Sequence, residues 1–496
     1  MAKPAQYKNK SRKSGRDGMM DKVINTPVDV DDIAISADTG GRKPLGITHK
    51  VILGTALVWS LFQIWIASPL PYMVDSDWFR FNGNQTRSIH LAFAIFLVFL
   101  SFPRSHKSPR NYVPISDWIV AAVAAFCAAY YFLDYEAISE RVGAPSIQDI
   151  VIACIGVPLL LEAARRSLGP ALVVIAVLFL LYSFYGNYMP ELIEHKGYSL
   201  SQVVNHQWVT TEGVFGVALG VSTDFVFLFV LFGALLEKAG AGNYFIKLAF
   251  SLLGHFKGGP AKAAVVASGL TGVISGSSIA NVVTTGTFTM PMMKRVGFSS
   301  EKAGAVEVAS SVNGQIMPPV MGAAAFLMVE YVGVSYIEVI THAFLPALIS
   351  YIALVYIVHL EALKYNMNGL PRRKNGLSFI RKISGFLLGF LGFSGLAVTV
   401  YYGMGWIKPI AGDDSGWVIA GLIAIIYVLL VRYSTGFPKI EMDDPDKPIE
   451  ELPDPGPIFK AGLHFLLPVI VLIWCLMVER LSPGLSAFWG STLLIF

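Results

Sequence analysis

Small side chains that carry oxygen gather at two neighbouring places in this 496-residue sequence. They are Ser275, Ser277, Ser278 and Asn281 at the first place, and Asn313 and Gln315 at the second. Neutral hydroxyl and amide oxygens are hard ligands, which suit Na⁺ better than the softer transition metals. Cysteine and histidine, which bind those softer metals, do not occur between residues 262 and 333. The pattern therefore predicts a sodium site.

Both places interrupt apolar segments whose lengths do not fit a simple membrane crossing. In residues 262–294 each arm beside the SGSS run has about fourteen residues and would be roughly 21 Å long, too short for a hydrocarbon core of about 30 Å. We therefore expect a re-entrant hairpin over 262–294. Residues 303–333 are too many for one crossing, and Pro318 and Pro319 stand near their middle. Because proline breaks a helix, we expect two half-helices around an unwound stretch.

Unwound backbone in the middle of a membrane leaves polar groups without partners unless it lines a cavity or binds a ligand. Secondary transporters use such breaks: backbone carbonyls coordinate Na⁺, and half-helix N-termini face an anionic group of the substrate. Each serine, threonine or glycine taken alone has a second explanation, because small residues also let membrane helices pack closely. Two adjacent breaks rich in oxygen are more specific, and they favour an ion-coupled transporter.

The composition of the whole chain is typical of a membrane protein. It is 54% hydrophobic and 15% charged, with a mean hydropathy of +0.57, whereas soluble proteins carry about 25% charged residues. Long apolar runs alternate with short polar loops, so we predict an all-α polytopic protein with about ten transmembrane helices plus the hairpin and the broken helix. The net charge of +4, without a basic stripe among aromatic residues, argues against a nucleic-acid partner.

The predicted crossings are apolar runs of about the length that a bilayer requires. They lie near residues 48–68, 88–103, 117–133, 147–164, 169–186, 221–237, 340–360, 383–404, 416–431 and 461–479. Basic residues gather in the N-terminal tail and in every second loop, and acidic or mixed loops lie between them. By the positive-inside rule the N-terminus is predicted to be cytoplasmic. We predict a multi-pass protein of a bacterial inner membrane.

Three features near the two breaks are interpreted as structural. Asp224 follows Ser222 and Thr223, which are good N-cap residues, so we expect an acid in the first turn of a helix. Glu307 is expected near the inner surface as an interfacial or paired carboxylate, not a proton relay. Residues 240–257 mix apolar and basic side chains and are predicted to form a helix along the inner surface.

Two segments carry a resemblance to a known family. GLTGVISGSSIANVVTTGTFTMPMMKRVGF and EVASSVNGQIMPPVMGAAAFLMVEYVGVSY resemble the large membrane component (DctM-like) of tripartite ATP-independent periplasmic (TRAP) transporters. The resemblance runs from about residue 45 to the end, and it is most similar to the TAXI branch, in which the two membrane subunits are fused. It implies a Na⁺-driven permease, not an enzyme, that takes up an organic anion delivered by a TAXI-type periplasmic substrate-binding protein.

The resemblance also implies how the chain is divided and where its site lies. Residues 1–47 would be a cytoplasmic tail, 48–208 a scaffold like the small subunit, and 209–496 the N-terminal part of the transport domain. The residues expected to bind sodium and substrate are Ser275, Gly276, Ser277, Ser278, Asn281, Asn313, Gly314, Pro318 and Pro319. No organic cofactor is expected. The family's transport domain is an inverted repeat, and since the SGSS and GQIMPP motifs occur once here, we expect a second half beyond Phe496.

Other functions stay open at this point. A sodium/dicarboxylate-type symporter also uses broken hairpins but works without a periplasmic protein. An intramembrane hydrolase would use Ser275, Ser277 or Ser278 as its nucleophile, but it needs a base within hydrogen-bond reach, and the sequence has no G-x-S-x-G elbow. A passive channel would conduct without a Na⁺ gradient. The sequence does not identify the substrate.

Overall fold

The computed structural model describes residues 41–74, 79–105, 107–141, 143–371, 415–437 and 452–495, together with four isolated positions between residues 402 and 412. Within these ranges the regular elements are helices, and no strand occurs. The prediction of an all-α polytopic membrane protein is therefore confirmed. Most of the tail over 1–47 and nearly all of the predicted crossing near 383–404 lie outside the described residues.

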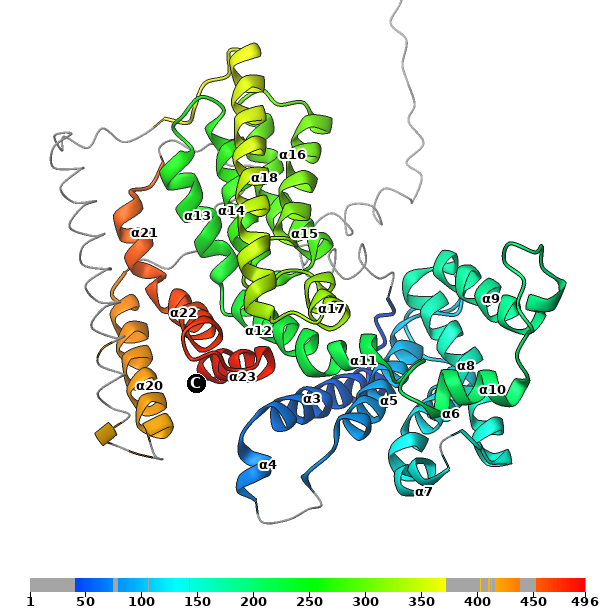
Figure 1. Cartoon of the computed structure of the whole chain (residues 1–496). Helices are drawn as coiled ribbons and strands as arrows, with labels where there is room; N and C mark the ends of the chain where they lie inside the picture. The colour runs from blue at the N-terminus through cyan, green and yellow to red at the C-terminus, as the bar shows by residue number, and fades with distance from the viewer. Residues whose placement is uncertain are drawn as a thin grey trace, which may run out of the picture.

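The N-terminal body is a bundle of helices, blue to teal in Figure 1. Its long members are α3 (Ile47–Ala67), α5 (Gly83–Ser101), α6 (Ile115–Leu133), α8 (Ile147–Leu168) and α9 (Pro170–Tyr185), and its short ones are α4 (Leu70–Met73), α7 (Tyr135–Glu140) and α10 (Leu200–Val204). The core lies where α5, α6 and α8 meet, and Phe99, Ala121 and Ala128 are fully buried there. Alanine at these positions lets the helix backbones approach closely.

A buried ion pair joins α6 to α8 at one end of the two helices, and at the other end Tyr130 of α6 and Arg141, which follows α7, both donate hydrogen bonds to Asp149 of α8. Asp117, at the start of α6, accepts hydrogen bonds from Arg42 at 2.5 Å and from Arg166 of α8 at 3.1 Å. At the opposite end, Asp149 in the first turn of α8 accepts from Arg141 at 2.8 Å. Charged groups inside a membrane protein need such partners, and these pairs fix how the two helices are aligned along their length.

A single apolar helix over Val217–Lys238 follows the bundle, and its two labelled parts are α11 (Val217–Val221) and α12 (Phe227–Lys238). A π-helical turn lies between them and contains Asp224. The prediction that a helix begins at Asp224 with an N-cap is therefore wrong, because a full turn of helix precedes that residue. The local sequence carries good capping residues, but the apolar run on both sides continues the helix through them.

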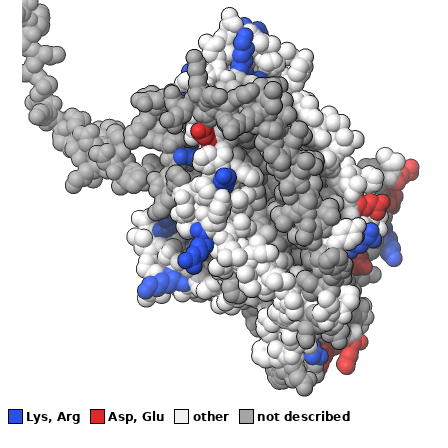
Figure 2. Space-filling model, turned by 90° about the vertical axis from the view of Figure 1, so that its left-hand side faces the viewer, with Lys and Arg blue, Asp and Glu red and all other residues white. Residues whose placement is uncertain are grey.

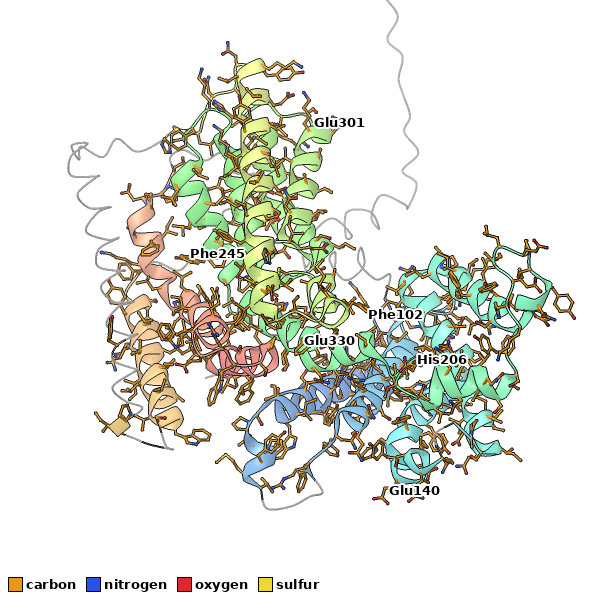
Figure 3. All side chains as sticks on the ribbon, viewed as in Figure 1. Phe102, Glu140, His206, Phe245, Glu301 and Glu330 are labelled. Atoms are coloured by element: carbon orange, nitrogen blue, oxygen red, sulfur yellow. The ribbon has the colours of Figure 1, made fainter. Side chains whose placement is uncertain are left out.

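The predicted hairpin and broken helix are both present as pairs of helices. α14 (Gly259–Ser275) and α15 (Ser278–Arg295) are separated by two residues, and α16 (Ser300–Gly314) and α17 (Ala323–Val332) by an irregular stretch. Glu301 at the start of α16 and Glu330 in α17 lie at opposite ends of the broken element (Figure 3). The helix breaks are thus confirmed, while the entry of the hairpin from one side of the membrane stays a prediction.

Two further helices enclose the hairpin. α13 (Ala241–Leu253) packs along α14 and buries Tyr244, Ile246 and Phe250, so it belongs to the packed core. A helix is thus present in this segment as expected, and its position along the inner surface of the membrane stays a prediction. On the other side α18 (Tyr336–Lys364) runs beside α14 and α16 (Figure 1).

The C-terminal helices pack against one another, and α21 and α23 connect them to α13 and α12 respectively. They are α20 (Ser415–Ser434), α21 (Pro455–Ala461), α22 (Leu463–Met477) and α23 (Pro483–Ile495). α21 and α22 form one apolar segment bent by 59° at Gly462. α23 lies against α12 and α22, and Gly484 makes this approach possible because a Cβ atom there would lie 2.6 Å from the Asp224 carbonyl oxygen.

Seven helices in the described residues are long and apolar enough to cross a membrane, or eight with the bent pair. They correspond to eight of the ten predicted crossings. Near 88–103 a helix is present as α5, but its first half carries polar residues and it does not reach the same apolarity. Figure 2 shows that the described surface on one face is mainly uncharged, which suits contact with lipid.

Candidate functional site

The hairpin turns within two residues. α14 ends at Ser275, Gly276 has a left-handed backbone with φ +61°, and Ser277 is extended. The Ser277 hydroxyl accepts a hydrogen bond from the Ala280 backbone N–H at 3.3 Å and so caps α15. A Cβ atom on Gly276 would lie 3.1 Å from the Met321 carbonyl oxygen, so glycine is needed both for the turn and for the close approach.

The break in the second element is an irregular stretch over residues 315–322. The Tyr336 hydroxyl donates a hydrogen bond to the Pro319 carbonyl at 2.6 Å, and the Gly322 N–H donates to the Gln315 carbonyl at 2.7 Å. The prolines remove backbone donors and end α16, which leaves carbonyl groups without helical partners. These two bonds hold the irregular backbone in one conformation.

The hairpin tip and the break lie against each other. The backbones of Gly272 and Gly314 touch: a Cβ atom on Gly272 would lie 2.7 Å from the Gly314 Cα atom. The Gln315 amide donates a hydrogen bond to the Ser278 hydroxyl at 3.1 Å. The two places singled out in the sequence, 275–278 and 313–319, thus meet in the structure, although about forty residues separate them in the chain.

Asn281 has a different environment from the other predicted site residues. Its side chain is buried, its Oδ1 atom accepts a hydrogen bond from the Thr271 hydroxyl at 2.6 Å, and its Nδ2 atom donates to the Ser268 carbonyl at 2.9 Å. The Ser268 hydroxyl in turn bonds to the Ser311 hydroxyl at 2.9 Å. Asn281 therefore connects the two arms of the hairpin, and through Ser268 the connection extends to α16.

A cavity of about 20 Å³ lies beside Asn281. Its polar lining residues are Thr271, Thr284 and Glu237, and the Thr284 hydroxyl donates a hydrogen bond to Glu237 at 2.8 Å. The volume is enough for one water molecule. Sequence reasoning did not single out Glu237, because it stands at the end of an apolar helix where a carboxylate usually faces the membrane surface.

Glu307 differs from its predicted environment. Its side chain is completely buried between α15 and α16, and its carboxyl oxygens lie within hydrogen-bond distance of the Thr289 hydroxyl, at 2.5 Å, and of the Thr285 and Ser311 hydroxyls. Within the described residues no lysine, arginine or histidine forms an ion pair with it. The interpretation as an interfacial or paired carboxylate is therefore wrong. The spacing of the two threonines, four residues apart on one face of α15, is the signal that could have located this contact.

The arrangement offers neutral oxygen atoms, irregular backbone that positions carbonyl groups, and close packing that holds both elements in place. Secondary transporters use such features to bind ions.

Comparison with known proteins agrees with this geometry. Residues 155–405, just over half of the chain, match the family described as "Tripartite ATP-independent periplasmic transporter, DctM component". The Sialic acid TRAP transporter permease protein SiaT of Haemophilus influenzae is 24% identical over 265 residues, which are 51% of this chain and 36% of that protein.

Two further relatives align over shorter segments. The C4-dicarboxylate TRAP transporter large permease protein DctM of Rhodobacter capsulatus is 35% identical over 91 residues, 18% of this chain and 21% of that protein. The Ectoine TRAP transporter large permease protein TeaC of Halomonas elongata is 30% identical over 95 residues, 19% of this chain and 22% of that protein. The chain thus spans about a third or less of the length of these relatives. Because the family match covers half of its residues, the chain belongs to the DctM-component family of tripartite ATP-independent periplasmic transporters.

Proposed function

We propose that this chain is the permease part of a Na⁺-coupled secondary transporter that takes up an organic anion. Relatives are named for C4-dicarboxylates and sialic acid, which carry carboxylates, and for ectoine. The observation that supports the proposal best is the contact between the hairpin tip at 275–278 and the break at 313–319. It brings neutral oxygen atoms from two broken elements to one place, as sodium sites of secondary transporters do.

In this proposal Na⁺ is held by backbone carbonyls and hydroxyls of Ser275, Gly276, Ser277 and Ser278, and by Asn313, Gly314 and Pro318. Asn281 and Pro319 take part mainly by fixing the backbone, since Asn281 joins the hairpin arms and Pro319 is held by Tyr336. An ion bound between tip and break would draw the two elements together. Half-helix N-termini such as that of α15 would then face the anionic substrate.

We further propose that a periplasmic substrate-binding protein of the TAXI type delivers the substrate, and that the protein lies in a bacterial inner membrane with its N-terminus in the cytoplasm. The helical bundle of α3 to α9 would act as a scaffold fused to the transport domain. The basic residues of the N-terminal tail and of alternate loops support the orientation.

The test is Na⁺-driven uptake by the full-length protein in proteoliposomes, with its binding protein and labelled carboxylates as probes. Ser277→Leu and Asn313→Leu should abolish uptake, because each removes an oxygen and fills the space around the proposed ion. Ser183→Leu is the matched control, since the Ser183 hydroxyl bonds to the Phe179 carbonyl of its own helix, α9, far from the site.

The outcomes separate the competing functions. Normal uptake by both site variants would refute the sodium assignment. Uptake that needs Na⁺ but no binding protein would indicate a sodium/dicarboxylate-type symporter. Uptake without any Na⁺ gradient would indicate a channel or another driving ion, and cleavage of a membrane peptide that depends on Ser277 would indicate a hydrolase.

A further inference from the structure

Glu307 occupies the centre of the contact between the hairpin and the broken helix. Its exposed fraction is 0%, and both of its carboxyl oxygens have hydroxyl partners. Thr285 bonds to Oε1 and Thr289 to Oε2, the latter at 2.5 Å, while Ser311 lies 3.4 Å from Oε1. All three partners are neutral, and they come from both packed elements. Such a carboxyl group within the membrane is by default a functional group.

The helices packed against α16 bring no cation to this carboxyl group. Their charged or titratable side chains, with those of α16 itself, are Lys262 on α14, Lys294 and Arg295 on α15, Glu301 and Lys302 on α16, and Tyr336, Glu338, His342, Tyr351, Tyr356, His359, Glu361 and Lys364 on α18. Lys262 bonds to His359, and Lys302 pairs with Glu361. The Tyr351 hydroxyl on α18 donates a hydrogen bond to the Ser310 carbonyl at 2.9 Å.

The hydrogen atoms around Glu307 can be counted. A threonine hydroxyl has one hydrogen to donate, but each threonine here has two acceptors within reach. For Thr285 they are Glu307 and the Asn281 carbonyl at 2.7 Å, and for Thr289 they are Glu307 and the Thr285 carbonyl at 2.9 Å. If the carboxyl group carries a proton, it can donate to the Thr289 oxygen, and Thr289 can then donate to the Thr285 carbonyl. Every hydrogen in this chain then has an acceptor.

An ionised Glu307 would be in a much less favourable position. Both threonines would have to turn their only hydrogen towards it, and no positive charge would compensate for the lost hydration. Removing an unpaired carboxylate from water costs far more than burying a neutral, hydrogen-bonded acid, so such a group takes up a proton instead. The short Thr289 contact fits a hydroxyl–carboxyl hydrogen bond in either direction.

We propose that Glu307 is a proton-binding site of the transport domain, protonated while α15 and α16 are packed as in this structure. The proton supplies the donor that completes the hydrogen-bond chain between the two elements. Separation of α15 from α16 would admit water to the carboxyl group and release the proton. Of the residues predicted to bind sodium and substrate, only Asn281 touches this chain, and it does so through its backbone carbonyl, so the proton site does not rest on the proposed function.

The experiment is infrared spectroscopy of the purified full-length protein in lipid at pH 7. An exposed glutamate, with a pKa of about 4.3, is ionised at that pH, so the C=O stretch of a protonated carboxyl group identifies a buried one. We expect this band in the wild type and in Glu301→Gln, and we expect Glu307→Gln to lose the intensity of one carboxyl group. Glu301 is the matched control, because it lies on the same helix but is exposed.

A second measurement covers the case in which Glu307→Gln does not fold. Wild-type protein with ¹³C-labelled glutamate must show the band shifted to lower frequency, and Thr289→Val must move the band because it removes the hydrogen-bond partner. A wild-type spectrum without a protonated glutamate band overturns the proposal. So does a band that keeps its full intensity in Glu307→Gln or does not respond to the label.

Discussion

The crossing of α14 and α16 at Gly272 and Gly314 allows a sharp test of how the site is built. In Gly272→Ala the new methyl group would lie 2.7 Å from the Gly314 Cα atom, whereas ordinary carbon–carbon contacts are about 3.5–4.0 Å. The neighbour is backbone, which no side-chain rotation can move. The two helices must therefore separate by roughly 1 Å, and they must do so directly beside the hairpin tip.

The expected change in stability combines two opposing terms. Overpacking of this kind costs about 1–3 kcal/mol, while replacing a glycine inside a helix by alanine gains about 0.5–1 kcal/mol. We therefore expect Gly272→Ala to lower the free energy of unfolding by up to about 2.5 kcal/mol. Gly304→Ala is the control on α16, because a Cβ atom there meets nothing within 4 Å, and the helix gain of about 0.5–1 kcal/mol should appear alone.

The measurement is thermal or denaturant unfolding of the purified variants, followed by Na⁺-driven uptake in proteoliposomes. The two alanine variants should shift stability in opposite directions, and only Gly272→Ala should reduce uptake. If Gly272→Ala proved as stable as Gly304→Ala, the close approach of the two backbones would not exist as described. If it were destabilised but transported normally, the proposed sodium site would not depend on this contact.

Three further predictions concern other parts of the molecule. Asp117→Ala removes the carboxylate that pairs with the buried Arg42 and leaves Arg166 with Glu162, so unfolding measurements should show a loss of about 3 kcal/mol. Glu136→Ala, at an exposed position, should cost far less, and equal losses would contradict a special role for Asp117. Tyr336→Phe leaves the Pro319 carbonyl without its hydroxyl partner, which should lower the free energy of unfolding by about 1–3 kcal/mol and weaken Na⁺-dependent uptake. Tyr331→Phe, at an exposed tyrosine, is the control and should behave as the wild type. Replacing Na⁺ by choline should lower the unfolding temperature of the wild type, because a bound ligand stabilises the folded state. The unfolding temperature of Asn313→Leu should not change. A wild type whose unfolding temperature does not respond to Na⁺ would count against the site.

Much of the fold follows from patterns that can be recognised in the sequence alone. The lengths of the apolar runs predicted most of the long helices, and Pro318 with Pro319 predicted the break in the second element, because a proline acts on its own backbone wherever the helix lies. The contact between the tip and the break could be expected only from adjacency in the chain. Its detail depends on Gly272, which looks like any other glycine in an apolar run.

The failures share a physical cause. The good capping residues beside Asp224 predict a helix start there, yet a cap is worth about 1 kcal/mol, less than a continuous apolar helix gains from burial. A carboxylate such as Glu307 is expected near the membrane surface, but its hydroxyl partners Thr285 and Thr289 come from another helix and cannot be recognised from the local sequence. Local signals locate elements well, whereas the environment of a polar side chain is set by packing between elements.

The composition of α14, α15 and α16 bears on how the protein enters the membrane during synthesis. None of these three helices has the length and apolarity of a spanning segment, and their hydroxyl, amide and carboxyl groups bond mainly to one another. Such helices gain little from lipid alone, because lipid offers their polar groups no partners. The insertion machinery would therefore release the neighbouring apolar helices into the lipid first. The hairpin would take up its final position in the membrane only after α13 and α18 had packed beside it. Biogenesis of this region is then an assembly step between protein segments, and a variant that weakens their contacts would reduce the yield of inserted protein before it affected transport.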